Sequence, residues 1–135
     1  MKTITLEATI KSIGIITDFA DRELQALDCP LRTQMQIRVA IDEIVSNIAR
    51  HAYAPDTGKI TVGFEFEEQD RTAVLTFMDE GIPFDPLQRA EPDVTLPAEK
   101  RPIGGLGILL VRKTMDDVTY RREDGKNILS IRKKF

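Results

Sequence analysis

The segment from Met35 to Tyr53 most constrains how this chain can fold, because it places two stripes of different chemistry on one predicted helix. Its isoleucines recur at steps of four, three and four residues, the period of a helix face buried against a core; they are Ile37, Ile41, Ile44 and Ile48. Glu43 and Asn47 form a second stripe, about 100° around the helix from the isoleucines. The segment therefore predicts an amphipathic helix with a carboxylate and a carboxamide beside the core.

This polar pair has two interpretations. Polar residues next to a core stripe usually form a solvated shoulder. Alternatively, Glu43 accepts a proton and the carboxamide oxygen of Asn47 binds a hard cation. The rest of the chain has to decide between the two.

Composition narrows the class of protein. The chain has 135 residues, 41% of them hydrophobic and 30% charged, which predicts one soluble globular domain covering residues 1–135. It contains no apolar run long enough to cross a bilayer, and its N-terminus alternates instead of forming a signal sequence, so we expect a cytoplasmic protein that does not bind membranes. The net charge of −3 is spread along the chain, which argues against direct nucleic-acid binding. The single cysteine, Cys29, is expected to be a small buried residue.

The N-terminal part predicts a strand followed by two helices. Apolar and polar residues alternate from Thr3 to Ile10, and Ser12 can cap a helix over Ile13–Leu27. Pro30 then opens the second helix.

Two hairpins follow in the sequence. The first joins a strand over residues 60–66 to a second over Thr72–Asp79, and the last joins Val118–Arg122 to Asn127–Lys133. In the second strand Asp79 shares the parity of Leu75 and Phe77, so it lies at the edge of the core. A carboxylate at that position needs a hydrogen-bond donor.

The segment from Ile82 to Ile103 separates the hairpins and shows no periodicity. Five of the seven prolines lie in it, and so long a connection in a compact domain is usually a functional lid or a disordered insert. It is followed by a glycine-rich stretch, Gly104-Gly105-Leu106-Gly107, just before a helical segment over Ile108–Met115. A glycine-rich loop at a helix N-terminus presents amide groups that suit phosphate, although three glycines can also form a hinge.

Three features follow one another along the chain: the helix with Glu43 and Asn47, the strand end at Asp79, and the glycine-rich segment over residues 104–107. In this order they resemble the GHKL ATPases, the superfamily of histidine kinases, gyrase and heat-shock chaperones. Within it, the sequence is most similar to the anti-sigma-factor serine/threonine kinases. The N box matches residues 43–47 with 51–53 following, the first glycine box matches residues 79–85, and the second matches residues 104–107.

The resemblance implies an α+β fold, the two-layer α/β sandwich called the Bergerat fold, with a mixed, mostly antiparallel sheet and helices on one face. ATP and Mg²⁺ are the implied ligands, with an ATP lid at about residues 82–103. The resemblance also implies a role for each site residue. Glu43 is the general base, Asn47 binds Mg²⁺, and Asp79 binds the adenine amino group. Gly81 lets the adenine ring approach closely, and the backbone amides of Gly105 and Gly107 bind phosphate. Arg50 lies on the Glu43 side of the helix, where it contacts either phosphate or solvent.

One segment departs from the family pattern. Members often carry Gly-Thr near the start of the last strand, where the threonine hydroxyl contacts phosphate, whereas this chain has Gly125-Lys126-Asn127. The resemblance still implies a kinase that phosphorylates a small STAS-type anti-sigma-factor antagonist and exchanges it for a sigma factor, as a homodimer. The alternatives are a non-catalytic, nucleotide-controlled switch that sequesters a partner, and a plain α/β domain with a disordered insert.

Overall fold

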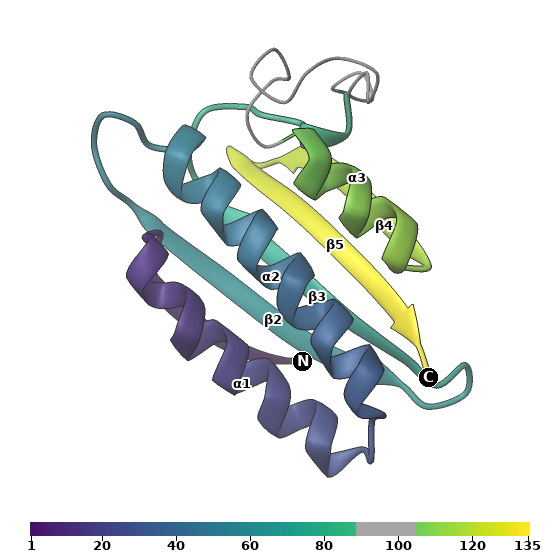
Figure 1. Cartoon of the computed structure of the whole chain (residues 1–135). Helices are drawn as coiled ribbons and strands as arrows, with labels where there is room; N and C mark the ends of the chain where they lie inside the picture. The colour runs from purple at the N-terminus through teal and green to yellow at the C-terminus, as the bar shows by residue number, and fades with distance from the viewer. Residues whose placement is uncertain (89–104) are drawn as a thin grey trace.

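The computed structural model describes residues 1–88 and 105–135, so residues 89–103 of the expected lid, and Gly104, lie outside the described residues. Three helices cover one face of a five-stranded sheet (Figure 1). The elements in chain order are β1 (Lys2–Glu7), η1 (Ile10–Ser12), α1 (Ile13–Ala26), α2 (Leu31–His51), β2 (Lys59–Glu67), β3 (Thr72–Asp79), η2 (Pro86–Gln88), α3 (Gly105–Thr114), β4 (Asp117–Glu123) and β5 (Lys126–Lys134). The predicted two-layer α+β sandwich is confirmed.

The sheet has the strand order β1-β2-β3-β5-β4, and each neighbouring pair of its strands is antiparallel. The expected parallel component of a mixed sheet is therefore absent among the described strands. The reason is that β5 forms a hairpin with β4 and inserts beside β3, so that it separates β3 from β4, which runs in the same direction as β3.

The start of the chain differs from the prediction in three details. The strand ends at Glu7, because the chain turns into η1, where Ile10 is 57% exposed. Ser12 makes no capping hydrogen bond, since its backbone is already helical as the last residue of η1. Pro30, expected to open the second helix, is instead the N-cap residue directly before α2, with an extended ψ of 144°.

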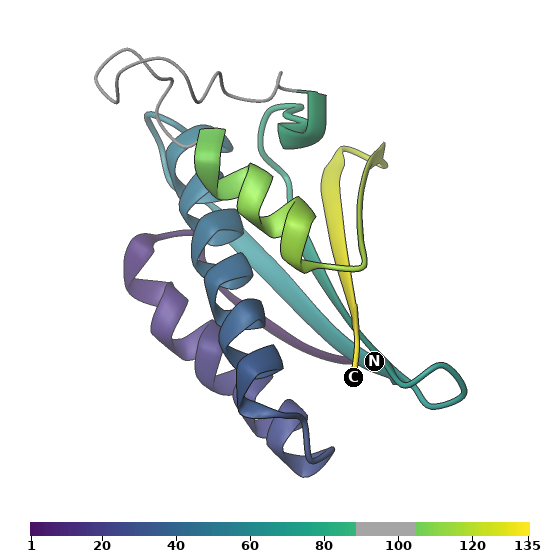
Figure 2. The same cartoon turned by 45° about the vertical axis from the view of Figure 1, so that its right-hand side comes forward.

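The core lies between the helices and the inner face of the sheet. The predicted isoleucine stripe of α2 is confirmed, with Ile37, Ile41 and Ile44 at most 1% exposed. They pack in one hydrophobic cluster with Leu75 and Phe77 of β3. Because α1 and α3 flank α2 on this face (Figure 2), α2 is the central helix of its layer.

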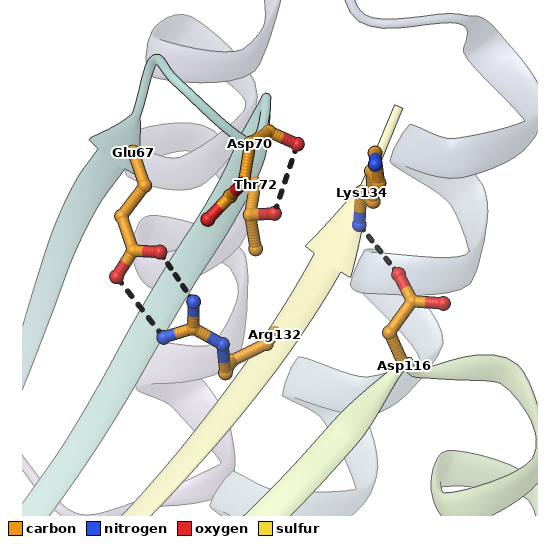
Figure 3. Close-up of polar contacts among 6 residues, drawn as sticks. All are labelled: Glu67, Asp70, Thr72, Asp116, Arg132 and Lys134. Carbon is orange, nitrogen blue, oxygen red and sulfur yellow. Dashed lines mark hydrogen bonds and ion pairs between the residues drawn. The ribbon is translucent and has the colours of Figure 1, made fainter.

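The two ends of the sheet carry different polar groups. At one end Arg132 of β5 donates from Nη1 to Oε1 of Glu67 at 3.1 Å and pairs with its second oxygen through Nη2, and the backbone amide of Lys134 donates to Asp116 (Figure 3). These contacts hold strand ends together on the surface. The opposite end, where Asp79 pairs in register with Asn127, carries the candidate site.

Candidate functional site

Four element ends meet at the candidate site: the C-terminal half of α2, the end of β3, and the beginnings of α3 and β5 (Figures 1 and 2). They enclose a cavity of about 30 Å³. Its lining includes Asn47, Phe77, Asp79, Phe84, Ile108, Tyr120 and Asn127. A space of this size holds about two water molecules, so we expect the walls to move apart before a nucleobase enters.

Glu43 lies one turn before Asn47 on α2 and is half-buried. Its Oε1 atom is buried and has no hydrogen-bond partner among the described residues. Burial raises the pKa of the Glu43 carboxyl, the positive charge of Arg50 lowers this pKa, and the negative charge of Asp42 raises it. A half-buried carboxyl with raised pKa and a free oxygen is suited to accept a proton.

Gly107, in the first turn of α3, lies directly against this carboxyl. A Cβ atom at Gly107 would lie 1.9 Å from Cδ of Glu43 and 2.1 Å from its Oε2 atom. Only the absence of a side chain at Gly107 therefore lets Glu43 occupy its position. This contact joins the expected N box to the second glycine box across 64 residues of chain.

Asn47 is 5% exposed and lines the cavity. Its Oδ1 atom accepts a hydrogen bond of 2.9 Å from Nη2 of Arg50, which comes from the next turn of α2. Arg50 is expected to contact either phosphate or solvent. The structure shows that its guanidinium is exposed and also donates to the carboxamide of Asn47. A carbonyl oxygen has two lone pairs, so Asn47 retains the capacity to bind a cation.

Asp79 is 4% exposed at the end of β3, in agreement with its predicted place at the edge of the core. Its Oδ1 atom accepts two hydrogen bonds of 2.9 Å, from the backbone amide of Gly81 and from Nδ2 of Asn127. No described residue donates to the second oxygen, Oδ2. The carboxylate therefore retains an acceptor at the cavity wall.

Gly81 permits a close approach between backbone segments. A Cβ atom here would lie 2.2 Å from the carbonyl oxygen of Ala52, and the amide of Ile82 donates to that oxygen at 2.9 Å. Tyr53 supports the same junction, since its hydroxyl donates to the carbonyl of Lys59 and accepts from the amide of Glu80. The first glycine box is thus held against the C-terminal end of α2.

Asn127 is the site residue whose importance the sequence did not reveal. It faces Asp79 from β5 and makes four hydrogen bonds while only 5% exposed. The family pattern points only to a lost threonine contact to phosphate at this position, whereas the structure places Asn127 beside the carboxylate expected to bind adenine. The parity it shares with Leu129 and Ile131 was the available signal, because it puts all three on the inner face.

The remaining expected phosphate ligand, Gly105, is the first residue of α3. A helix N-terminus at this place offers backbone amides and a positive dipole end toward the side of Glu43 and Asn47. The expected role of Gly105 and Gly107 as amide donors stays a prediction.

The donor set fits Mg²⁺ delivered with a nucleotide better than a resident metal ion. Among the described residues no group of three or more histidine, cysteine, aspartate or glutamate side chains converges on a metal position. Mg²⁺ usually keeps several waters and takes one or two protein ligands plus substrate phosphates. Asn47, whose carboxamide oxygen keeps a second lone pair beside its hydrogen bond from Arg50, fits that pattern.

Within residues 1–88 and 105–135, none of the helices has the length and apolar character needed to span a membrane. The longest of these helices, α2, has 21 residues but carries the polar stripe described above.

Sequence comparison gives one family and several relatives. The family described as the histidine kinase-like ATPase domain matches residues 6–133. Serine-protein kinase RsbW from Bacillus cereus (strain ATCC 10987 / NRS 248) is 36% identical over 97 residues, which cover 69% of this chain and 59% of that protein. The namesake from Bacillus mycoides (strain KBAB4) is 34% identical over the same shares. The matched part of the chain thus spans less than two thirds of the length of these relatives.

Comparison with solved structures supports the fold. The structure of the RsbU and RsbW domains of Rv1364c from Mycobacterium tuberculosis aligns with a TM-score of 0.67 at 15% identity, over 99% of this chain and 32% of that one. The histidine kinase AdeS from Acinetobacter baumannii aligns with a TM-score of 0.51 at 15% identity, over 99% of this chain and 68% of that one. At this identity the two structures establish a shared architecture.

Proposed function

Because the chain belongs to the family of histidine kinase-like ATPase domains, we propose that it is a serine/threonine protein kinase that uses Mg²⁺ and ATP. In this proposal the adenine of ATP binds in the cavity beside Asp79, and the phosphates bind between Asn47 and the N-terminus of α3. The relatives named as serine-protein kinases support transfer to a hydroxyl group.

The observation that carries the proposal is the state of Glu43. A buried carboxyl oxygen without a partner is costly, and folded proteins rarely retain one outside functional sites. Here the Oε1 atom of Glu43 has no partner among the described residues, and the carboxyl occupies space that a side chain at position 107 would fill. The carboxyl is therefore kept for a group that arrives with the substrates.

The proposed mechanism assigns one task to each side chain. Asp79 accepts a hydrogen bond from the exocyclic amino group of adenine, and the α3 N-terminus holds phosphate. Bound through Asn47, Mg²⁺ would neutralise charge on the phosphates. Glu43 takes the proton from the attacking serine or threonine hydroxyl. The oxygen of that hydroxyl bonds to the γ-phosphorus as the bond to ADP breaks and ADP leaves.

For the protein substrate, we propose a small STAS-type antagonist of an anti-sigma factor, which this chain would exchange for a sigma factor as a homodimer. The resemblance to the anti-sigma-factor kinases and the RsbW relatives support this assignment. The exposed side chains of Ile10 and Ile15, near the edge strand β1, offer one apolar surface to a partner.

Calorimetric titration with ATP and ADP, each with and without Mg²⁺, tests the nucleotide site. We expect saturable binding that Mg²⁺ strengthens, followed by transfer of radiolabel from γ-labelled ATP to a purified STAS-type antagonist. Binding without transfer would favour the alternative, a non-catalytic switch that sequesters a partner. Absence of binding at millimolar nucleotide would contradict both proposals.

A further inference from the structure

The carboxamide of Asn127 is the most highly connected side chain in the candidate site. Its Nδ2 atom donates to Oδ1 of Asp79 at 2.9 Å and to the carbonyl of Ile82 at 2.8 Å. Its Oδ1 atom accepts from the backbone amide of Phe84 at 3.3 Å and from the hydroxyl of Tyr120. All donor and acceptor positions of a carboxamide are thereby used.

These partners also determine which way the amide faces. In the opposite orientation the oxygen of Asn127 would face two acceptors, the Asp79 carboxylate and the Ile82 carbonyl, while its NH₂ group would face the backbone amide of Phe84, which can only donate. The orientation with Nδ2 toward Asp79 is the only one in which every group is paired. Asn127 is therefore a fixed donor to the carboxylate.

This fixed donor has a consequence for the carboxylate of Asp79. With Gly81 and Asn127 both donating to Oδ1, that oxygen is fully occupied, and Oδ2 is left as the acceptor at the cavity wall. The hydrogens of Asn127 are themselves engaged, so the side chain has none to offer a ligand. Of the described residues that bond this carboxylate, neither Gly81 nor Asn127 keeps a hydrogen for a ligand, so Asp79 presents an acceptor alone.

We propose that Asn127 is a positioning residue for base selection: by holding Asp79 with Oδ2 toward the cavity, it makes the site accept 6-aminopurines and reject 6-oxopurines. This inference rests on the proposed nucleotide site. Adenine carries an amino donor at position 6, whereas guanine and hypoxanthine carry a carbonyl acceptor there. A 6-oxo group would meet Oδ2 of Asp79 with no hydrogen between them, leaving two buried acceptors unpaired.

The test compares ADP with inosine diphosphate (IDP), because the two nucleotides differ only around position 6 of the base. Calorimetry on the purified full chain gives the ratio of their dissociation constants. We expect the wild-type protein to bind ADP about 10- to 100-fold more tightly than IDP, the effect of one lost hydrogen bond and an unpaired acceptor.

Two substitutions of Asn127 by side chains of the same shape, valine and threonine, isolate the effect of a hydrogen-bond donor to Asp79. Both Asn127→Val and Asn127→Thr lose the contacts to Ile82, Phe84 and Tyr120, yet only threonine retains a hydroxyl that can donate to the carboxylate. We expect the valine variant to bring the IDP/ADP ratio to about 3-fold or less, and the threonine variant to keep an intermediate ratio. Ser130→Ala, which removes a hydroxyl on the other face of β5, should leave the ratio unchanged.

The outcomes separate the inference from the proposed function. If both nucleotides weaken equally in Asn127→Val, so that the ratio stays at its wild-type value, Asn127 is merely structural and the inference is overturned, while the nucleotide site stands. Equal ratios in the valine and threonine variants would also overturn it, because the donor would then carry no selectivity. If the wild-type protein binds neither nucleotide, the proposed function fails and the inference with it. Thermal denaturation of each variant identifies the folded samples, and the threonine variant keeps the test available if the valine variant unfolds.

Discussion

The two ends of the candidate site satisfy their polar groups in opposite ways. At the end where we propose that adenine binds, called the base end, Asn127 uses its full hydrogen-bonding capacity and occupies one oxygen of Asp79. At the end proposed for the phosphates, called the phosphate end, Glu43 has a buried oxygen without a partner among the described residues, and the hydrogen bond that the Asn47 oxygen accepts within those residues comes from the exposed Arg50.

This difference shows which part of the site contributes to folding. A fully paired buried network rigidifies the structure around it. An unpaired buried carboxyl costs free energy, which a protein tolerates where the group is needed for activity. We therefore expect substitutions at the base end to lower both stability and affinity, and substitutions at the phosphate end to lower activity alone.

The largest effect should come from Glu43→Gln. The amide has nearly the same shape but cannot accept the proton of the attacking hydroxyl, so phosphate transfer to a STAS-type antagonist should fall by about 10²- to 10⁴-fold. The ADP affinity measured by calorimetry should stay near the wild-type value. Asp42→Asn, which changes the exposed neighbouring carboxylate, is the matched control. Undiminished transfer by Glu43→Gln would remove Glu43 from the mechanism.

Next in size is the effect of Gly107→Ala. The new methyl group would overlap the carboxyl of Glu43, which we expect to be displaced. Transfer should fall by about 10²-fold, the cost of a misplaced reacting group, while the free energy of unfolding changes by less than about 1 kcal/mol, since alanine favours a helix.

Gly14→Ala controls for that substitution, because a Cβ atom at Gly14 of α1 has no atom within 4 Å. It should raise stability by roughly 0.5–1 kcal/mol without changing transfer. Because Gly107→Ala acts through Glu43, combining it with Glu43→Gln should cost little beyond Glu43→Gln alone. A fully additive double variant would show that the two residues act independently.

Asp79→Asn tests the base end. The new oxygen can still accept from Gly81 and Asn127, which leaves an NH₂ group facing the cavity in place of Oδ2. ADP affinity should fall by about 10- to 100-fold, with a stability loss of about 1 kcal/mol. IDP, whose oxygen can accept from the new donor, should lose less, and calorimetry with both nucleotides checks this. Equal losses for ADP and IDP would place the base elsewhere.

Much of this site could be predicted from periodicity. The helical period placed Glu43 and Asn47 beside the core, and the parity of β3 placed Asp79 at its edge, because each feature depends on residues a few positions apart. The ends of elements were less predictable. The strand over Thr3–Ile10 stops at Glu7 because the chain turns into η1, where the amide of Thr9 donates to the carbonyl of Glu7 and the amide of Ser12 donates to that of Thr9.

The contacts that complete the site could not be predicted, since they join segments distant in sequence. Glu43 meets Gly107 only because α3 packs beside α2, and Asn127 meets Asp79 only in the register that pairs β3 with β5. A local pattern gives the face of a residue but not its partner on another element. Asn127 therefore stood out in sequence only as a departure from a family motif.

A smaller effect concerns stability as a function of pH. Burial raises the pKa of Glu43 in the folded protein, so the folded state retains this proton at pH values where the unfolded chain has released it. The resulting stabilisation is full below the unfolded pKa and is lost as pH rises through the folded pKa. Urea denaturation between pH 4 and pH 7 should thus show Glu43→Gln gaining stability relative to wild type as pH rises. A difference that does not vary with pH would mean that Glu43 is solvated.

The smallest effect should follow Arg50→Gln, and it decides whether burial or charge controls the phosphate end. Burial raises the pKa of Glu43 and the charge of Arg50 opposes it, so removing that charge should move the acid limb of the transfer pH profile to higher pH. The shift should be small and should disappear at high salt, because Arg50 is exposed and its field is screened. Arg50→Lys keeps the charge while changing the hydrogen bond to Asn47, so it should leave the profile near that of wild type. If instead Arg50→Lys shifts the limb as far as Arg50→Gln does, the hydrogen bond to Asn47 matters more than the charge. Each end of the site would then depend on a hydrogen-bonded carboxamide, that of Asn127 at the base end and that of Asn47 at the phosphate end. The two ends would differ only in the Glu43 oxygen that has no partner among the described residues.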